Sequence, residues 1–319
     1  MTRLFKRLFA FDAWIPFVVA SHASAQNTPL ATSKKILHVA QLTLHPVPIP
    51  GGVLAPNIAK KGICLQHYAY PGLWFLAFNM NDPVVGGMTP AHVALRRAIG
   101  LAIDSQAAID TAMYGAGTPA NGVVPPGIAG HDAAFRTDVY SLNLPRARAL
   151  LDTFGYVDRN FVGWREDPAG KPLTITVINQ AEPRMVPRDE LYARAFASIG
   201  IRLVFDRVIA EERYKSMQSG KCQVGLDAWN MEFPDAEDFY IILSGKTVGM
   251  TNTSQWVNTE FDALYERSNR MADSPERNAL YRKMDRIVFT YAPVMCIYIC
   301  NAPPSVSRGC KAMCRTPST

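Results

Sequence analysis

The sequence predicts an α/β protein, because short apolar strands alternate with amphipathic helices over much of its 319 residues. Hydrophobic residues make up 48% of the chain and charged residues 19%, the balance of a globular protein with a buried core. The formal net charge of +6 is mild and is not concentrated in one run. The sequence has no zinc finger, aromatic–basic motif or long basic helix, so we expect no nucleic-acid partner.

The first 25 residues have the order of a secretory signal peptide. The basic segment MTRLFKR is followed by the apolar stretch LFAFDAWIPFVVA and then by an Ala-x-Ala step that ends at Ala25. Asp12 interrupts the apolar stretch, which leaves an amphipathic cytoplasmic helix as the alternative. No later stretch has the roughly 18 apolar residues that a membrane span needs, so we expect a soluble exported protein.

Residues 26–72 are poorly patterned, with one possible strand in KKILHVAQLTL and a Pro/Gly-rich loop after it. From residue 73 the pattern is clear, and GLWFLAFNM predicts a buried strand. A helix is expected to open at Thr89-Pro90, and a second to be capped by Ser105 and closed by Gly115. The segment 119–127 predicts a stiff surface loop.

Strands and helices alternate regularly from residue 145 onward. Three helices are predicted to end at glycines, which favour the left-handed conformation after a helix: Gly155, Gly200 and Gly220. The strands LTITVIN, IRLVFDRVI and CQVGLDAW lie between and after them. Two helices capped by Asn258 and Ser274 then precede the last strand, VMCIYIC. The pattern therefore covers residues 73–300, and residues 301–319 are expected to be an irregular tail.

Four of the six cysteines lie near the C-terminus, at Cys296, Cys300, Cys310 and Cys314. In a strand, positions four residues apart are about 13 Å apart. Cys296 and Cys300 could then neither form a disulfide nor share a metal ion without a bend. We therefore expect buried strand thiols and a loose tail, with a disulfide and a metal site as the alternatives.

The segment WNMEFPDAEDFY, residues 229–240, places four carboxylates among aromatic side chains. Three of these acids follow a proline and suit the first turn of a helix, where they favour the helix dipole: Asp235, Glu237 and Asp238. Glu232 instead follows directly after a predicted strand, where ligands of open α/β sheets collect. Beside Trp229, it could hold an ammonium group by a charge-assisted hydrogen bond and the ring face.

A metal-dependent exported hydrolase that uses Glu232, Asp235 and Asp238 is a further alternative. Hard cations need several oxygens that converge on one point, and these acids fit a helix start better. The sequence contains no HExxH, no G-x-S-x-G and no phosphate-binding glycine loop. We therefore expect no catalytic residue, no bound metal and no cofactor.

Blocks in a fixed order run from Phe78 to about Tyr298. They are FNMNDPVVGG with ALRRAIGLAIDSQAAID, GAGTPANGVVPPGIAGHD, LPRARALLDTFGYVDRN, GKPLTITV with SIGIRLVFDRV and SMQSGKCQVGLDAW, WNMEFPDAEDF, and EFDALYERSNRMADSPERNALYRKMDRIVFTYAPVMCIY. Together they resemble the family 5 extracellular solute-binding proteins of ABC importers, the receptors for peptides, dipeptides and nickel.

The resemblance implies a periplasmic-binding-protein-like (type II) fold, in which two α/β lobes joined by a hinge close on a ligand. Such proteins are not enzymes. They capture a small molecule or peptide in the periplasm and deliver it to ABC permease subunits in the inner membrane. We expect a monomer with this role.

The resemblance also implies ligand-binding residues. In dipeptide-binding members, an acid at the position of Glu232 holds the amino group of the peptide, and here that acid is one methylene longer. An arginine holds the peptide carboxylate at the position that is Asn179 here, which is not basic, and Arg184 is near enough in sequence to substitute. The expected ligand-binding residues are therefore Glu232, Trp229, Asn179, Arg184 and Asp235.

Members of the family are much longer than this chain. KKILHVAQLTL resembles their first strand, yet the next block belongs to their second half, so most of one lobe is expected to be absent and the fold to be incomplete. A truncated, non-transporting remnant, which persists as a fragment or as a partner-binding module, is therefore the alternative to a working receptor.

Overall fold

The computed structural model describes residues 71–113, 115, 117–137 and 141–300, together with the backbone of two short strands. The chain divides into two units, one from Tyr68 to Pro303 and one made of Met1–His67 and Pro304–Thr319. The predicted signal peptide, the strand predicted in KKILHVAQLTL, and Cys310 and Cys314 lie outside the described residues.

The smaller unit contributes one described element, an antiparallel ribbon of β1 (Ile63–Gln66) and β8 (Ser305–Arg308). The sequence pattern predicts neither strand, and β8 lies within the tail that was expected to be irregular. A pair of four-residue strands has too few residues for an alternating apolar pattern to be recognised.

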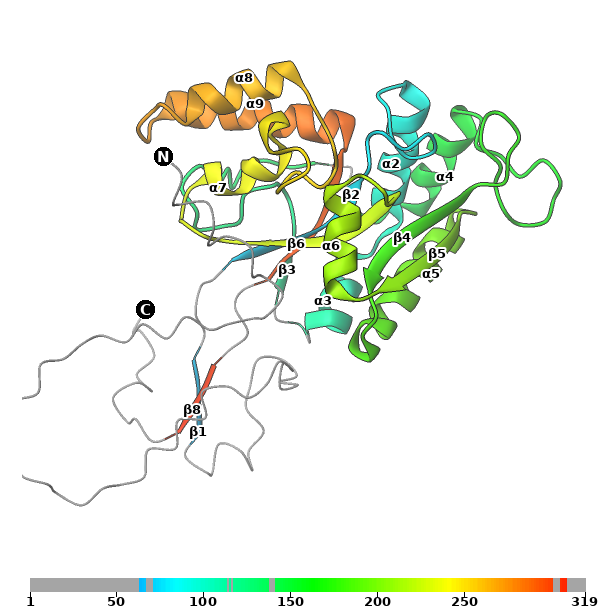
Figure 1. Ribbon diagram of the computed structural model, residues 1–319, viewed down its shortest axis with the longest axis horizontal. Coiled ribbons are helices and arrows are strands. Elements are labelled where there is room, and N and C mark those ends of the chain that lie inside the picture. The colour runs from blue at the N-terminus through cyan, green and yellow to red at the C-terminus, as the bar shows by residue number, and fades with distance from the viewer. Residues whose placement is uncertain are drawn as a thin grey trace, which may run out of the picture. The chain divides into compact units, whose positions relative to one another are not determined.

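A six-stranded mixed sheet forms the centre of the larger unit, in the order β3-β7-β2-β6-β4-β5 (Figure 1). Its strands are β2 (Gly72–Phe78), β3 (Gly117–Pro119), β4 (Thr174–Gln180), β5 (Arg202–Val208), β6 (Val224–Asn230) and β7 (Val294–Cys300). β4 pairs in parallel with β5 and with β6, whereas β2 pairs antiparallel with β6 and β7. The last predicted strand is therefore not at the edge, because it enters between β2 and β3.

Eight α-helices and three 3-10 turns accompany the sheet in the described residues. The helices are α2 (Pro90–Ala102), α3 (Ser105–Met113), α4 (Leu144–Thr153), α5 (Val186–Ser198), α6 (Ala210–Gln218), α7 (Ala236–Tyr240), α8 (Thr259–Ser268) and α9 (Pro275–Tyr291). The 3-10 turns are η2 (Pro183–Met185), η3 (Ile241–Leu243) and η4 (Gly245–Thr247). Figure 1 shows α8 and α9 side by side, and β4 and β5 as neighbours at one end of the sheet.

Helix starts follow the capping residues that the sequence predicts, with one exception. The side chains of Thr89, Asn258 and Ser274 each accept a hydrogen bond from the backbone N–H three residues later. At α3 the prediction was wrong by one residue, since Oδ1 of Asp104 accepts from the N–H of Ala107 at 3.0 Å. An aspartate is as good a cap as a serine, so the sequence alone could not choose between the two neighbours.

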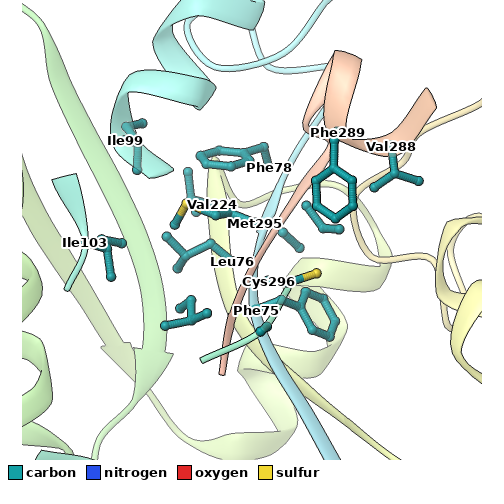
Figure 2. Packing of buried hydrophobic residues seen from close by; sticks show 14 of the residues in the cluster. Phe75, Leu76, Phe78, Ile99, Ile103, Val224, Val288, Phe289, Met295 and Cys296 are labelled. Atoms are coloured by element: carbon teal, nitrogen blue, oxygen red, sulfur yellow. The ribbon is translucent and has the colours of Figure 1, made fainter. Parts of the chain in front are cut away.

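The core of the larger unit lies between the central strands and the helices that cover them. Figure 2 shows Phe75, Leu76 and Phe78 of β2 packed near Val224 of β6 and Met295 of β7. All five side chains are at most 2% exposed. Burying one side chain of this size stabilises the fold by about 1.5–3 kcal/mol. The central strands therefore form a stable support for the residues at their ends, which are described below.

The segment 119–127 is only in part the surface loop that was expected: Pro119, Asn121, Pro126 and Gly127 are exposed, but the apolar residues between them are buried. Val123 and Val124 are 0% and 4% exposed, and Ala120 is 3% exposed. The N–H of Ala120 donates to the carbonyl of Ile297 at 3.2 Å, which extends the pairing of β3 with β7. Proline and glycine indicate a turn correctly, but they do not show that the apolar residues between them face the core.

None of the helices in the described part of the chain is long and apolar enough to cross a membrane.

Candidate functional site

The strand register decides which face of the sheet each candidate residue occupies. Leu73 of β2 lies opposite Trp229 of β6, and Trp74 lies opposite Ala228. Directly paired residues share a face and successive residues alternate, so the side chains of Trp229 and Trp74 point to opposite faces. Ile178 of β4 lies opposite Gly225 of β6, which shares the face of Trp229, so the next residue, Asn179, points to the face of Trp74. Trp229 and Asn179, both expected site residues, therefore lie on different faces at the same end of the sheet.

Different helices cover these two faces. Gly225 lies on the same face of β6 as Trp229, and its missing side chain makes room for Met217 of α6. On the other face, the guanidinium carbon of Arg188, from the first turn of α5, lies 5.4 Å from the centre of the Trp74 ring. Arg188 is thus a functional candidate that the sequence analysis missed.

Asp235 has a structural role in this turn. It caps α7, with Oδ1 accepting from the N–H of Glu237 at 2.8 Å. Arg277 of α9 donates from Nη1 to Oδ2 at 2.6 Å and from Nη2 to Oδ1 at 2.9 Å, and the hydroxyl of Tyr281 donates to Oδ1 at 3.3 Å. Both carboxylate oxygens are engaged within the fold, so the expected contact between Asp235 and a ligand gains no support from the geometry.

Asp238 is also held inside the turn. It is 2% exposed, and its Oδ2 accepts from the backbone N–H of Glu232 at 2.9 Å. Burial raises the pKa of Asp238 to about 6, and this rise is opposed by the N–H of Glu232 and by the indole of Trp229. The indole N–H lies close enough to lower that pKa but makes no hydrogen bond of standard geometry. Asp238 therefore fixes the backbone that carries Glu232.

Glu237, the remaining first-turn acid, is half-buried, and its pKa is raised by burial and by Asp235. Its backbone carbonyl accepts from the hydroxyl of Tyr265 at 3.2 Å. The prediction that three of the four acids belong to the start of a helix is confirmed by the positions of Asp235, Glu237 and Asp238.

Glu232 differs from its acidic neighbours because its side chain is exposed. Within the described residues, its carboxylate makes neither an ion pair nor a hydrogen bond. The half-buried Trp229 and the 43% exposed Phe233 stand on either side of it in sequence. Glu232 is therefore an exposed carboxylate without a partner among the described residues, on a backbone that Asp238 holds in place.

Asn179 lies at the end of β4 and is 3% exposed. Its Nδ2 donates to Oδ1 of Asp189 at 2.6 Å, and its Oδ1 accepts from the N–H of Gln180 at 2.8 Å and from Nη2 of Arg188 at 3.3 Å. Asn179 is therefore placed to position Arg188 rather than to reach a ligand itself. Arg184 lies in η2, and its side chain is outside the described part of the structure.

Arg188 is the centre of a buried polar group that we call the Arg188 cluster: Trp74, Asn179, Arg188, Tyr192 and Tyr298. Arg188 is 3% exposed, and its Nε has no hydrogen-bond partner. The hydroxyls of Tyr192 and Tyr298 are buried without hydrogen-bond partners of standard geometry as well. Trp74 stacks on Tyr298 with ring centres 5.8 Å apart. The hydroxyl of Tyr298 still lies near enough to Arg188 for the arginine to oppose the rise of its pKa. Buried polar groups without well-formed hydrogen bonds are unusual, because unmet buried donors are costly.

The acid next to Arg188 in sequence pairs elsewhere. Oδ2 of Asp189 lies 3.0 Å from Nη2 of Arg207, on β5. Burial raises the pKa of Asp189, and the charges of Arg188 and Arg207 oppose that rise. A usable sequence signal did exist, because Arg188, Tyr192 and Phe196 fall on one face of α5 and a charge on an apolar helix face is uncommon.

The described residues contain no group of three or more His, Cys, Asp or Glu side chains placed to hold a metal ion. Cys222, Cys296 and Cys300 form no disulfide bond in the described residues. The prediction that Cys296 and Cys300 are buried strand thiols is confirmed, since both lie in β7 and are at most 4% exposed.

Comparison with known proteins decides the family. Residues 17–251 match the sequence model of the bacterial extracellular solute-binding proteins, family 5 Middle. The chain belongs to this family. The resemblance inferred from the ordered blocks is thereby confirmed.

Two curated relatives of this family 5 protein are named for different ligands. Heme-binding protein A of Haemophilus influenzae is 28% identical over 249 residues, which are 76% of this chain and 43% of the relative. The dipeptide-binding protein of Escherichia coli K12 is 23% identical over 254 residues, 79% of this chain and 44% of the relative. The family 5 chain thus spans less than half the length of these relatives.

Solved structures confirm the predicted fold class. The oligopeptide-binding protein AppA of Bacillus subtilis, in complex with a nonapeptide, matches with a TM-score of 0.67 and 16% identity over 79% of this chain and 50% of that one. The murein tripeptide binding protein of Escherichia coli matches with a TM-score of 0.63 and 18% identity, over 79% of this chain and 47% of that one. The family 5 chain therefore has a periplasmic-binding-protein-like α/β fold that corresponds to about half of those structures.

Proposed function

We propose that this chain is the substrate-binding subunit of an ABC importer, which captures a peptide or a similar amine-bearing solute and delivers it to permease subunits. The proposal places the protein in the periplasm, as a monomer without catalytic activity. Its support is family membership, together with relatives that are named for dipeptide and di/tripeptide binding.

The single observation that carries this proposal is the free carboxylate of Glu232. Its neighbours Asp235 and Asp238 are engaged by Arg277 and by backbone N–H groups, whereas Glu232 has no partner in the described residues. An ammonium group would supply a charge-assisted hydrogen bond there, and the ring of Trp229 would add a cation–π contact. Glu232 is thus proposed as the residue that holds the amine.

An acidic end of the same solute would have Arg188 as its partner. From the sequence, the positions of Asn179 and Arg184 were expected in this role, but the side-chain amide of Asn179 is engaged by Asp189 and Arg188. An anion at Arg188 would accept from its Nε and from the hydroxyl of Tyr192, which lack partners, and from the hydroxyl of Tyr298, which lies close enough to Arg188 for its pKa to be lowered by it. Because Trp229 and Trp74 occupy opposite faces, such a solute would extend across the end of β6.

A ligand screen tests the proposal. The purified protein is titrated with defined dipeptides, tripeptides and N-acetylated dipeptides, and the thermal midpoint is followed. A ligand that binds only the folded state at 100 times its Kd raises the unfolding free energy by about 2.7 kcal/mol. We expect free-amine peptides to raise the midpoint and N-acetylated peptides to have no effect.

The variant Glu232→Gln should weaken binding by at least tenfold, since a hydrogen bond to a charged group is worth about 1.5–3 kcal/mol. Glu260→Gln is the matched control, because Glu260 is an exposed acid in the first turn of α8. No stabilisation by any peptide would contradict the proposal, and equal losses in both variants would remove Glu232 from the site.

A non-transporting remnant that acts as a partner-binding module is the second candidate. The observation that favours it is the aligned length, since this chain matches only 43% and 44% of the length of the two relatives described above. A folded protein that unfolds cooperatively but binds none of the peptides would support this candidate. A peptide that binds and raises the midpoint would exclude it.

A further inference from the structure

A groove lined by arginines lies away from the residues discussed so far. It has a volume of about 560 Å³ and is formed by α2, the C-terminal half of α9 and the segment 131–137. Four of its lining residues are arginines: Arg97, Arg136, Arg282 and Arg286. No residue expected to contact the amine-bearing solute lines this groove.

Among the residues that the structure describes, acidic side chains do not balance the positive charges in the groove. Asp132 is the one acidic residue among the described lining residues, and its Oδ1 accepts from the backbone N–H of Ala134 at 2.9 Å. Arg136 donates two hydrogen bonds to backbone carbonyls of its own turn. Across the described residues, Arg97, Arg282 and Arg286 form no ion pair or hydrogen bond with their side chains.

The helical spacing makes this arrangement costly in the absence of an anion. Arg282 and Arg286 are four residues apart on α9, so their side chains project from the same helix face. Like charges at this spacing destabilise a helix by about 0.2–0.5 kcal/mol. The next positions along that row, Asn278 and Thr290, carry no charge. Asp285, three residues after Arg282, is buried and accepts a hydrogen bond from Tyr240 instead.

The walls of the groove are held by contacts that do not involve the free arginines. The buried Arg96 of α2 donates from Nε to the carbonyls of Tyr291 and Ala292, both at 3.1 Å, and from Nη2 to that of Tyr291 at 2.6 Å. These bonds tie the end of α9 to α2. The ring of Phe135 stacks on Phe289 of α9, with centres 5.2 Å apart, which ties in the third wall. The arginines therefore stand on a preformed frame.

We propose that this groove binds a small soluble molecule that carries two or more negatively charged groups, phosphates or carboxylates. Guanidinium groups match both by paired hydrogen bonds. The volume falls within the range of about 300–1,000 Å³ that is usual for small-molecule sites and exceeds the space that one inorganic anion fills. The ring of Phe135 supplies an apolar surface for the body of the molecule.

Isothermal titration with tripolyphosphate and with citrate tests this proposal, in parallel with acetate and at constant ionic strength. We expect saturable one-to-one binding of at least one polyanion and none of acetate. The double variant Arg282→Gln/Arg286→Gln should weaken that binding by at least tenfold, and Arg97→Gln should weaken it independently. Circular dichroism at the working temperature shows that each variant is folded.

The matched control is Arg267→Gln/Arg270→Gln, which removes two charges from exposed positions on and just after α8. It should leave polyanion binding unchanged, so an equal loss in both double variants would show only a net-charge effect and overturn the proposal. Sedimentation with vesicles of anionic phospholipid provides a second arm. Binding to vesicles without binding to either soluble polyanion would also overturn it. The peptide titrations are independent of this site and should be unaffected by Arg282→Gln/Arg286→Gln.

Discussion

Arg277 binds both carboxylate oxygens of Asp235, with Nη1–Oδ2 at 2.6 Å and Nη2–Oδ1 at 2.9 Å. The arginine is on α9 and the aspartate caps α7, so the pair joins two helices that are separated by more than thirty residues of sequence. Its side chains are 6% and 22% exposed, which makes it a largely buried pair. The turn that presents Glu232 is therefore held in place from α9.

Asp235→Asn should destabilise the protein by about 3 kcal/mol, because it breaks the paired contact and leaves the buried guanidinium with only the exposed Asp273 as an acidic partner. Urea unfolding at pH 7 measures the loss. Asp273→Asn is the matched control: Asp273 also contacts Arg277, at 2.8 Å, but its side chain is 72% exposed. We expect that control to lie within about 0.5 kcal/mol of the wild type. A stable Asp235→Asn variant that fails to bind peptide would instead place Asp235 in the ligand site.

Gly130→Ala should cost about 3 kcal/mol or more, from left-handed strain and overpacking together. Gly130 has φ of +91°, and an added Cβ would lie 2.6 Å from Cβ of Ala236 and 2.8 Å from the Tyr281 ring. Gly127→Ala provides the comparison, since Gly127 has φ of +85° but no atom within 4 Å of the same position. That variant should lose about 1 kcal/mol by chemical unfolding. Equal losses would show that close packing at Gly130 does not matter.

Asp285 should make stability fall as the pH rises. It is 6% exposed, accepts from the hydroxyl of Tyr240 at 2.9 Å, and has a pKa raised by burial from 3.8 to about 7. A folded-state pKa above the unfolded value means that the folded state binds the proton more tightly. The stabilisation is therefore complete below about pH 4 and is lost as the pH rises through about 7.

Asp285→Asn should remove this dependence. Between pH 5 and pH 8, the unfolding free energy of the wild type should fall by roughly 2–3 kcal/mol more than that of the variant. Asp110→Asn, an exposed position on α3, should keep the wild-type slope. Identical slopes for the wild type and Asp285→Asn would contradict the assignment. The comparison cancels other groups, including Asp238, whose pKa of about 6 acts in the same direction.

The thiols of Cys296 and Cys300 should resist alkylation in the native protein. They are 1% and 4% exposed, and burial raises the pKa of Cys300, so little reactive thiolate forms. Burial also raises the pKa of the partly exposed Cys222 to about 11. Treatment with N-ethylmaleimide at pH 8, with and without denaturant, followed by peptide mass mapping, tests this. Modification of Cys296 or Cys300 only in denaturant is expected, and a Cys296–Cys300 disulfide would contradict the strand geometry.

Local features of the sequence predicted most elements of the larger unit. The alternation of apolar and polar residues in a strand, as in IRLVFDRVI, can be read from residues that are adjacent in sequence. The same is true of the helix caps at Thr89, Asn258 and Ser274. Failures occurred where two local choices were nearly equal, as at Asp104 and Ser105, or where burial depends on distant residues, as at Val123. The family was also within reach of the sequence, because its blocks occur in order along the chain.

By itself, the sequence determined the α/β class, the family and the segment that carries Glu232, because these depend on residue order and short-range periodicity. Only the tertiary structure decided that β7 enters the middle of the sheet and that Trp229 and Trp74 face opposite sides. It also decided that Asp235 is held by Arg277 and that Asn179 supports Arg188. The strand register and the contacts between helices that are distant in sequence set these relationships. The partner of a residue in such a contact cannot be inferred from the sequence around that residue.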